Sequence, residues 1–189
     1  MMLSSVARRS PSLLRTRALA FCGHSTRRAL STGSSDDLTV DEVLDRQAAW
    51  AKAITDISST YKANGDYVQS AADAAGELYG YGHGNVLFKP TKAAEHPFRP
   101  TGNEAMSYFV GGNAVDDGYS EDAGFAINGG KGWAKVEFTN HAIDLHGPVA
   151  IAMGSYDFTC ATTNDIVKVE YTFGYKRNED GKARIFLHQ

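Results

Sequence analysis

Apolar residues recur at spacings of three and four between residues 43 and 61, which is the periodicity of a helix with one buried face. The positions on this face are Val43, Gln47, Trp50, Ile54, Ile57 and Tyr61. Thr39 followed by Glu42 forms a capping box, and Leu38 can pack against Val43 across it. Asn64-Gly65 is a stop signal. The pattern therefore predicts a long first helix that starts next to Thr39.

Two shorter helices and one short strand are expected in the next part of the chain. Asp66 starts a second helix, whose apolar positions are Val68, Ala71, Ala72, Ala75 and Leu78. A strand is expected at 85–89, and Pro90 ends it because proline cannot donate to a sheet. A second capping box begins at Thr101 and starts a third helix that runs through Phe109.

The second half of the sequence alternates between apolar and polar residues, which predicts strands with one buried face. The expected strands are 134–138, 149–153, 166–177 and 183–189. In the third of them the apolar side carries Val167, Val169, Tyr171, Phe173 and Tyr175. Helices followed by antiparallel strands predict an α+β fold. We expect the N-terminal helices to pack against a strongly curved, mostly antiparallel sheet that encloses a pocket.

The first 35 residues differ from the rest in composition. They contain six arginines, many serines, and no lysine, aspartate or glutamate. This Arg-rich and acid-poor bias is typical of an organellar transit peptide. We therefore expect residues 1–35 to be a cleaved targeting segment, mitochondrial or alternatively plastid, and residues 36–189 to be the folded domain. The alternative interpretation is a basic arm that binds nucleic acid or lipid.

Charge and cysteine content exclude several functions for residues 36–189. Removing the first 35 residues leaves 13 Lys and Arg against 22 Asp and Glu, a formal charge near −9. Such a domain repels phosphate backbones, which argues against a nucleic-acid partner. Only Cys160 remains, so neither a disulfide framework nor a thiolate metal site is expected, and we expect Cys160 to be buried. No apolar run is long enough to span a membrane.

Several stretches resemble the signature blocks of the iota class of carbonic anhydrases, in the order of that family. They are GYGHGNVLFKPTKA at 80–93, FRPT at 98–101, SYFVGG at 107–112, GYSEDAGFA at 118–126, VEYTFGY at 169–175 and IFLH at 185–188. The resemblance covers most of the predicted domain. The order of helices and strands also resembles the SnoaL-like, kinase-association-domain-like cone, which often assembles into dimers or larger rings. We therefore expect a homodimer.

The resemblance implies reversible hydration of CO2 to bicarbonate. In metal-free members a threonine, a tyrosine and a C-terminal His-x-Ser line the bicarbonate pocket, and their counterparts here are Thr91, Tyr108 and His188. Other members of the family prefer manganese or zinc. Where the family reads His-His-Ser-Ser, this sequence reads His188-Gln189, so the pocket serine has no counterpart. We expect that serine either to follow Gln189 in a longer chain or to be absent.

The residues offer no obvious metal site. The histidines outside the first 35 residues are scattered, and no two have the spacing of a zinc site: His83, His96, His141, His146 and His188. A manganese site is conceivable on the glycine- and aspartate-rich loop at 111–132, whose carboxylates include Asp116, Asp117, Glu121 and Asp122. A solvated acidic loop is the simpler interpretation.

Without a metal, the hydroxyl groups of Thr91 and Tyr108 would orient a water molecule. His188 would act as base or proton shuttle, since the unperturbed pKa of histidine is about 6.5. Phe88, Phe109, Tyr171 and Phe173 could supply an apolar wall for CO2, although Tyr171 also fits a purely structural position in the core. Two further functions stay open, namely a non-catalytic association module and a SnoaL-like isomerase or hydratase.

Overall fold

The computed structural model describes residues 36–189. The predicted transit peptide at 1–35 lies outside the described residues. Three α-helices and five strands follow one another in the order α1, α2, β1, α3, β2, β3, β4 and β5, with two short 3-10 helices, Gly112–Ala114 and Asn128–Gly130, before β2. No helix within 36–189 is long and apolar enough to cross a bilayer.

The three helices start at the caps that the sequence predicts. Helix α1 spans Val40–Lys62 and α3 spans Gly102–Val110, and the capping boxes at Thr39 and Thr101 are both formed. Helix α2 spans Tyr67–Leu78, with the Asp66 carboxylate accepting a hydrogen bond from a backbone N–H of its first turn. The predicted apolar face of α1 is buried except for Tyr61, which is half-buried.

The five strands form one sheet in the order β1-β5-β4-β3-β2. Their bounds are β1 Leu87–Phe88, β2 Trp133–His146, β3 Val149–Cys160, β4 Ile166–Arg177 and β5 Ala183–His188. All neighbours are antiparallel except β1 and β5, which run parallel. The α+β class and the mostly antiparallel sheet are therefore confirmed.

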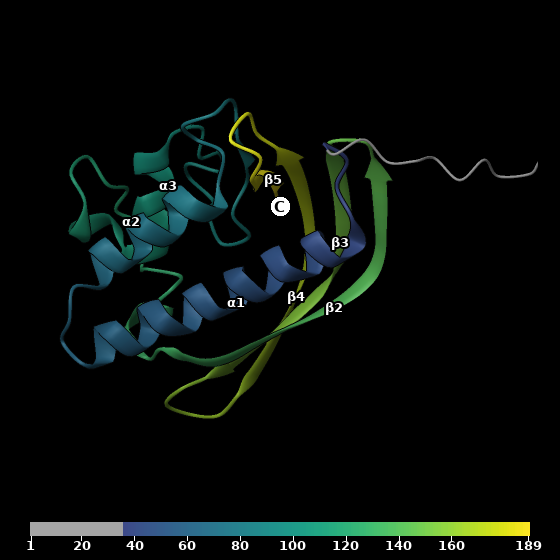
Figure 1. The fold of residues 1–189 in the computed structure, drawn as a ribbon. Coiled ribbons are helices and arrows are strands. Elements are labelled where there is room, and N and C mark those ends of the chain that lie inside the picture. Colours follow the sequence, from purple (N-terminus) through teal and green to yellow (C-terminus); the bar gives the residue numbers. More distant parts are fainter. Residues whose placement is uncertain (1–35) are drawn as a thin grey trace, which may run out of the picture. The chain divides into compact units, whose positions relative to one another are not determined.

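The expected strong curling of the sheet is wrong, because the sheet stays open, although its long strands bend along their length (Figure 1). Bulges in β2 between Asn140 and Ala142, and in β4–β5 next to Gly174, supply local bends. Strand β2 is also longer than predicted. Its polar second half is mostly exposed, so the burial pattern that marks a strand in the sequence is weak there.

Helix α1 crosses one face of the sheet, and α2 and α3 lie at the end of the sheet that holds β5 (Figure 1). Trp50 on α1 is 2% exposed and packs against aromatic side chains of β2, β3 and β4. Burying an aromatic side chain of this size contributes roughly 1.5–3 kcal/mol. Cys160 is buried, as predicted.

The loop at 111–132 is held in place by polar contacts. The Ser58 hydroxyl on α1 donates to the carbonyl of Ala126 and accepts from the N–H of Trp133. Gly112 is required by close packing, since a Cβ atom there would lie 1.9 Å from the carbonyl oxygen of Tyr119. The loop is therefore part of the fold and positions the end of α3.

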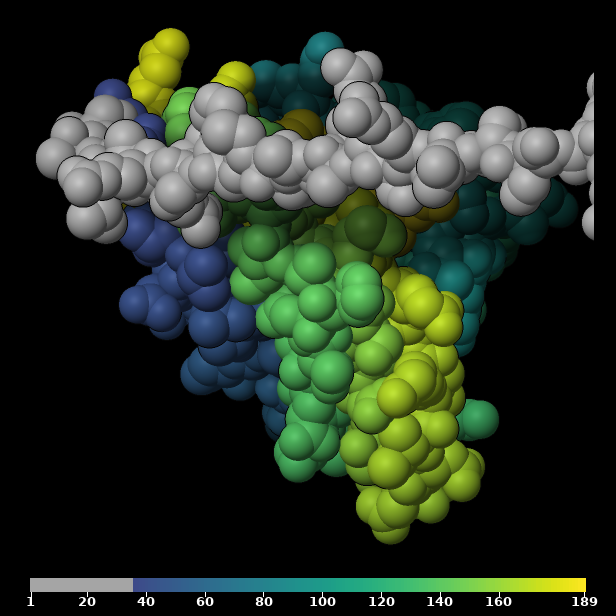
Figure 2. Space-filling view, turned by 90° about the vertical axis from the view of Figure 1, so that its right-hand side faces the viewer, coloured from purple at the N-terminus to yellow at the C-terminus, as the bar shows by residue number. Residues whose placement is uncertain are grey.

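The opposite face of the sheet is not covered by any helix of the described residues. Figure 2 shows β2 in green next to the yellow-green surface of β3 and β4 on this side. Met153 on β3 is 52% exposed there. We call this surface the outer face.

Candidate active site

His188 is the last residue of β5 and lies between two strands. It pairs with Phe88 on β1 and with Phe173 on β4, and its side chain is 6% exposed. Its imidazole stacks on the Phe88 ring with a centroid distance of 4.7 Å and lies 4.1 Å from the Phe173 ring. His188 therefore belongs to the aromatic interior rather than to the surface.

A chain of hydrogen bonds fixes the tautomer of His188. Trp50 Nε1–H donates to the Tyr79 hydroxyl over 3.0 Å, and that hydroxyl lies 2.8 Å from His188 Nδ1. The indole is a donor only, so the Tyr79 oxygen is already an acceptor and its own proton is free for Nδ1. The His188 proton then sits on Nε2, which lies 3.5 Å from the Tyr156 hydroxyl.

Burial lowers the pKa of His188 to about 3, because the charged imidazolium would lose its hydration in this environment. The pKa of His188 therefore lies well below the value near 6.5 that the sequence led us to expect. At neutral pH the ring is uncharged, and its Nε2–H is a hydrogen-bond donor. This geometry favours an orienting role over that of a general base.

Tyr108 lies in the last turn of α3 and is 7% exposed. Its hydroxyl forms a hydrogen bond with the backbone N–H of Lys92, so its own proton can be donated elsewhere. Burial raises the pKa of Tyr108 well above 10, which keeps the phenol protonated at all physiological pH values. Its ring packs on Phe88, which stacks on His188, and the Tyr156 hydroxyl lies 3.5 Å from His188 Nε2. Tyr108, Tyr156 and His188 thus belong to one group.

Aromatic side chains surround this group, and we call them the aromatic cluster. Its members are Trp50, Phe88, Tyr108, Phe109, Phe125, Tyr156, Phe173 and His188. Phe88 joins both candidate residues, with its ring 5.8 Å from Tyr108 and 4.7 Å from His188. The predicted apolar wall of Phe88, Phe109 and Phe173 therefore lies together.

Tyr171 is placed differently from the other predicted wall residues. Its ring is buried beside Tyr156 and Phe173, but its hydroxyl donates to Asn140 Oδ1 over 2.7 Å and accepts from Gln47. Gln47 lies on α1 and Asn140 on β2, so these hydrogen bonds connect the helix to the sheet. Tyr171 thus serves the packing of the sheet, in line with the structural alternative.

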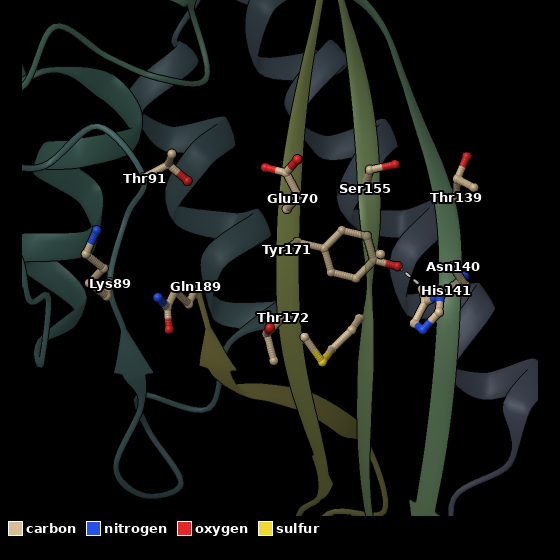
Figure 3. A pocket seen from close by; sticks show the side chains of 12 residues that line it. Lys89, Thr91, Thr139, Asn140, His141, Ser155, Glu170, Tyr171, Thr172 and Gln189 are labelled. Carbon is tan, nitrogen blue, oxygen red and sulfur yellow. Dashed lines mark hydrogen bonds between the residues drawn. The ribbon is translucent and has the colours of Figure 1, made fainter.

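Thr91 is exposed and faces a hollow of about 690 Å³ on the outer face. Figure 3 shows Thr91 and Lys89 on one side of this hollow and His141 on the other, with Glu170 on β4 between them. Ser155 and Thr139 continue the row of Glu170 across the sheet. The structure therefore brings Tyr108 and His188 together in one aromatic cluster but turns Thr91 to another surface.

Two of the four candidate manganese ligands, Glu121 and Asp122, are bound by donor groups of the protein. Glu121 accepts the backbone N–H groups of Ala94, Glu95 and His96. These three bonds lower the pKa of Glu121 to about 2. Within residues 36–189 no three His, Cys, Asp or Glu side chains lie close enough together to hold a metal ion. The simpler interpretation of the acidic loop is favoured, with Asp116 and Asp117 exposed to solvent and Glu121 and Asp122 bound by the protein.

Asp122 completes this arrangement. It accepts hydrogen bonds from the buried Arg99 guanidinium at 2.9 Å and from the Ser107 hydroxyl at 2.6 Å. Arg99 also lies 3.6 Å from Glu121 and over the ring of Tyr119. The two carboxylates thus join the segment at 94–99 to the loop after α3.

Sequence reasoning missed three residues of the site, namely Tyr79, Tyr156 and the indole donor of Trp50. Tyr156 alternates with Phe158 along β3, a signal that marks an inward position. Tyr79 follows the end of α2, next to the GYGHGN stretch, and no periodic pattern identifies it. Only the fold shows that these groups meet His188.

Comparison with known proteins identifies the family of the chain. The sequence profile of the family "Metal-independent carbonic anhydrase" matches residues 41–189. A metal-independent carbonic anhydrase from Nostoc sp. (strain PCC 7120) is 39% identical over 157 residues, which cover 80% of this chain and 72% of that protein.

A crystal structure of an iota-carbonic anhydrase from a cyanobacterium, in complex with bicarbonate, superimposes with a TM-score of 0.74. It is 37% identical and covers 82% of this chain and 92% of the other. The family is described as metal-independent, which agrees with the expectation of no metal cofactor. Because the match is to enzymes, the association-module and isomerase alternatives are not retained. This chain belongs to the family of metal-independent carbonic anhydrases, the iota class.

Proposed function

We propose that the protein hydrates CO2 reversibly to bicarbonate at Tyr108, next to the aromatic cluster. The observation that carries this proposal is the position of Tyr108. Its phenol stays protonated, its oxygen is held by the backbone N–H of Lys92, and the residue lines a cleft of about 300 Å³. A donor fixed in this way needs little reorganisation when charge develops on a substrate.

The reaction forms a C–O bond and breaks one C=O π bond, and it transfers one proton from the attacking water to a solvent water. The oxygen of a water molecule attacks the carbon of CO2, one C=O π pair moves to an oxygen of CO2, and the water loses a proton to solvent. Negative charge develops on the CO2 oxygen, and the Tyr108 O–H donates to it. One such donor typically contributes a factor of about 10²–10³ in rate. The role of Thr91 as a second hydroxyl stays a prediction.

His188 is proposed to orient the site rather than to take the proton. Its Nδ1 is occupied by Tyr79, its Nε2–H faces Tyr156, and its ring stacks on Phe88, which also packs on Tyr108. A base with a pKa of about 3 would hold a proton only rarely at neutral pH. Phe88, Phe125 and Phe173 supply an apolar surface that suits CO2 and limits water around the reacting atoms.

Stopped-flow measurement of CO2 hydration by the full chain tests this assignment. Tyr108→Phe should lower kcat by about 10²–10³, while the protein stays folded by circular dichroism. Tyr67→Phe is the matched control, because Tyr67 is a partly buried tyrosine on α2 that packs on Tyr61. Equal activity in Tyr108→Phe and wild type would refute the role of Tyr108.

The proposed compartment is the mitochondrion, with a plastid as the alternative. The support is the Arg-rich, acid-poor composition of residues 1–35. Fusion of these residues to a fluorescent protein should direct it to mitochondria. Retention in the cytosol would contradict the proposal, and a plastid signal would replace it.

The proposed assembly is a homodimer that covers the outer face. Its support is the exposed Met153 on a surface of β2, β3 and β4 that no helix of residues 36–189 covers. Light scattering should give the mass of two chains. Met153→Lys should shift the species towards the mass of one, and a wild-type chain that is already monomeric would refute the dimer.

A further inference from the structure

The cleft beside Tyr108 has a cationic rim. Its lining includes Tyr108, Glu121, Asp122 and two lysines, Lys92 and Lys131, and we call it the lysine cleft. Lys92 follows β1 and Lys131 follows the short helix at 128–130, so two segments distant in sequence supply the two ammonium groups. Both lysines are exposed.

The carboxylates of the lysine cleft are bound by other groups of the protein, whereas its lysines are not paired with a carboxylate. Glu121 is bound by three backbone N–H groups, and Asp122 is bound by Arg99 and Ser107. Within residues 36–189 neither Lys92 nor Lys131 has a carboxylate partner. The two lysines and Arg99 exceed the two carboxylates by one charge, and only the lysine charges are free to meet a ligand.

The cleft also differs in polarity from a second opening of the aromatic cluster. That second cleft, of about 310 Å³, is lined by Phe88 and His188 and by apolar side chains that include Leu87, Phe98 and Leu187. Leu87 and Phe98 are 60% and 68% exposed. One lysine, Lys89, also lines this second cleft, together with Arg99, which is paired with Asp122. An anion would therefore meet more free positive charge at the side that carries Tyr108, where two lysines lie.

We propose that Lys92 and Lys131 capture and release bicarbonate, so that the lysine cleft is the route of the anion to and from Tyr108. This inference rests on the proposed function, since it names the path of that reaction's charged product. Two cations on a cleft raise the local concentration of an anion and speed its association, and salt weakens both effects. The lysines guide the anion and take no part in the bond changes.

The test compares two double variants of the full chain at low ionic strength. Lys92→Gln/Lys131→Gln removes the two rim charges. Lys52→Gln/Lys168→Gln removes two charges from exposed lysines on α1 and β4, each paired with an aspartate outside the cleft. The measured quantity is the inhibition constant of bicarbonate in CO2 hydration, which reports the affinity of the enzyme for bicarbonate. The ratio of the kcat/KM values in the two directions cannot serve, because the equilibrium constant of the reaction fixes it.

The rim variant should bind bicarbonate roughly three- to tenfold more weakly than wild type, and added salt should remove the difference. The control variant should match wild type. Equal inhibition constants in the two double variants would overturn the inference, even where Tyr108→Phe has lost its activity. An active Tyr108→Phe enzyme would overturn the proposed site whatever the lysines do, so the two failures are distinguishable.

Discussion

At the scale of single residues, burial moves two titrating groups in opposite directions and leaves both uncharged. It raises the pKa of Tyr108 well above 10 and lowers the pKa of His188 to about 3. Neither group therefore changes its charge between pH 5 and 8. The site offers fixed hydrogen-bond donors instead of a titrating base, so activity should not depend on a histidine near pH 6.5.

Tyr79 is expected to hold the tautomer of His188. In Tyr79→Phe both Trp50 Nε1–H and His188 Nδ1 lose their partner, which should cost about 1–3 kcal/mol of unfolding free energy. Nitrogen NMR should show the Nε2–H form of His188 in wild type and a mixture of tautomers in the variant, together with a lower kcat. Tyr81→Phe is the control, because the Tyr81 hydroxyl donates to the backbone of Arg99. An unchanged tautomer in Tyr79→Phe would refute this role.

His188 should also make stability depend on pH. Its pKa is lower in the folded than in the unfolded chain, so the unfolded state binds more protons between about pH 6.5 and about pH 3. Above pH 6.5 His188 is neutral in both the folded and the unfolded chain, so it does not make stability depend on pH. Below that value the free energy of unfolding should fall by about 1.4 kcal/mol per pH unit.

Urea unfolding of wild type and His188→Gln between pH 7 and 5 measures this slope. The free-energy difference between the two proteins should shrink as the pH falls. His141→Gln, which removes an exposed histidine on β2, should run parallel to wild type. Parallel curves for His188→Gln and wild type would contradict the burial effect.

Much of the site could be predicted at the residue scale, but its electrostatics could not. The motifs point to Tyr108 and His188, and the structure places both in one aromatic cluster. Sequence spacing cannot show that β5 ends beneath Phe88 and Phe173, and it is this burial that removes the basicity of His188. The outward direction of Thr91 depends in the same way on the path of the chain after Pro90.

At the scale of elements, one arginine and two carboxylates organise the surroundings of Tyr108. Arg99 is fully buried and pairs with Asp122, while Glu121 binds three consecutive N–H groups at 94–96. These contacts connect the segment that carries Lys92 with the loop that follows Tyr108. The arrangement explains why an acidic loop holds its shape without a metal.

Glu121→Gln should loosen the segment at 94–96, because a neutral amide accepts these three hydrogen bonds more weakly than a carboxylate does. Hydrogen exchange of the amides of Ala94, Glu95 and His96 should become faster. Glu95→Gln changes an exposed neighbour and should leave exchange as in wild type. If these amides exchanged faster in Glu95→Gln than in Glu121→Gln, the contacts to Glu121 would not be what orders the segment.

Helix starts and the positions of the strands along the chain follow from local rules, whereas the bend of the sheet does not. The capping boxes at Thr39 and Thr101 are read directly from residue types. The bend depends on bulges such as the one after Asn140, where Tyr171 and Gln47 bind the Asn140 side chain. Such long-range contacts leave no periodic signal.

At the scale of the whole described domain, two surfaces compete for the substrate. One is the lysine cleft at Tyr108, and the other is the larger hollow on the outer face that contains Thr91. The outer hollow holds one lysine, Lys89, and also Glu170, whose carboxylate repels bicarbonate (Figure 3). Volume alone favours the outer hollow, whereas the two unpaired lysines and the aromatic surroundings favour the cleft.

A crystal structure of the full chain grown in saturating bicarbonate decides between these surfaces. We predict a bicarbonate ion with one oxygen within about 3 Å of the Tyr108 hydroxyl, between that group and the lysine rim. A bicarbonate ion bound instead beside Thr91 on the outer face, with the lysine cleft empty, would contradict the proposed site.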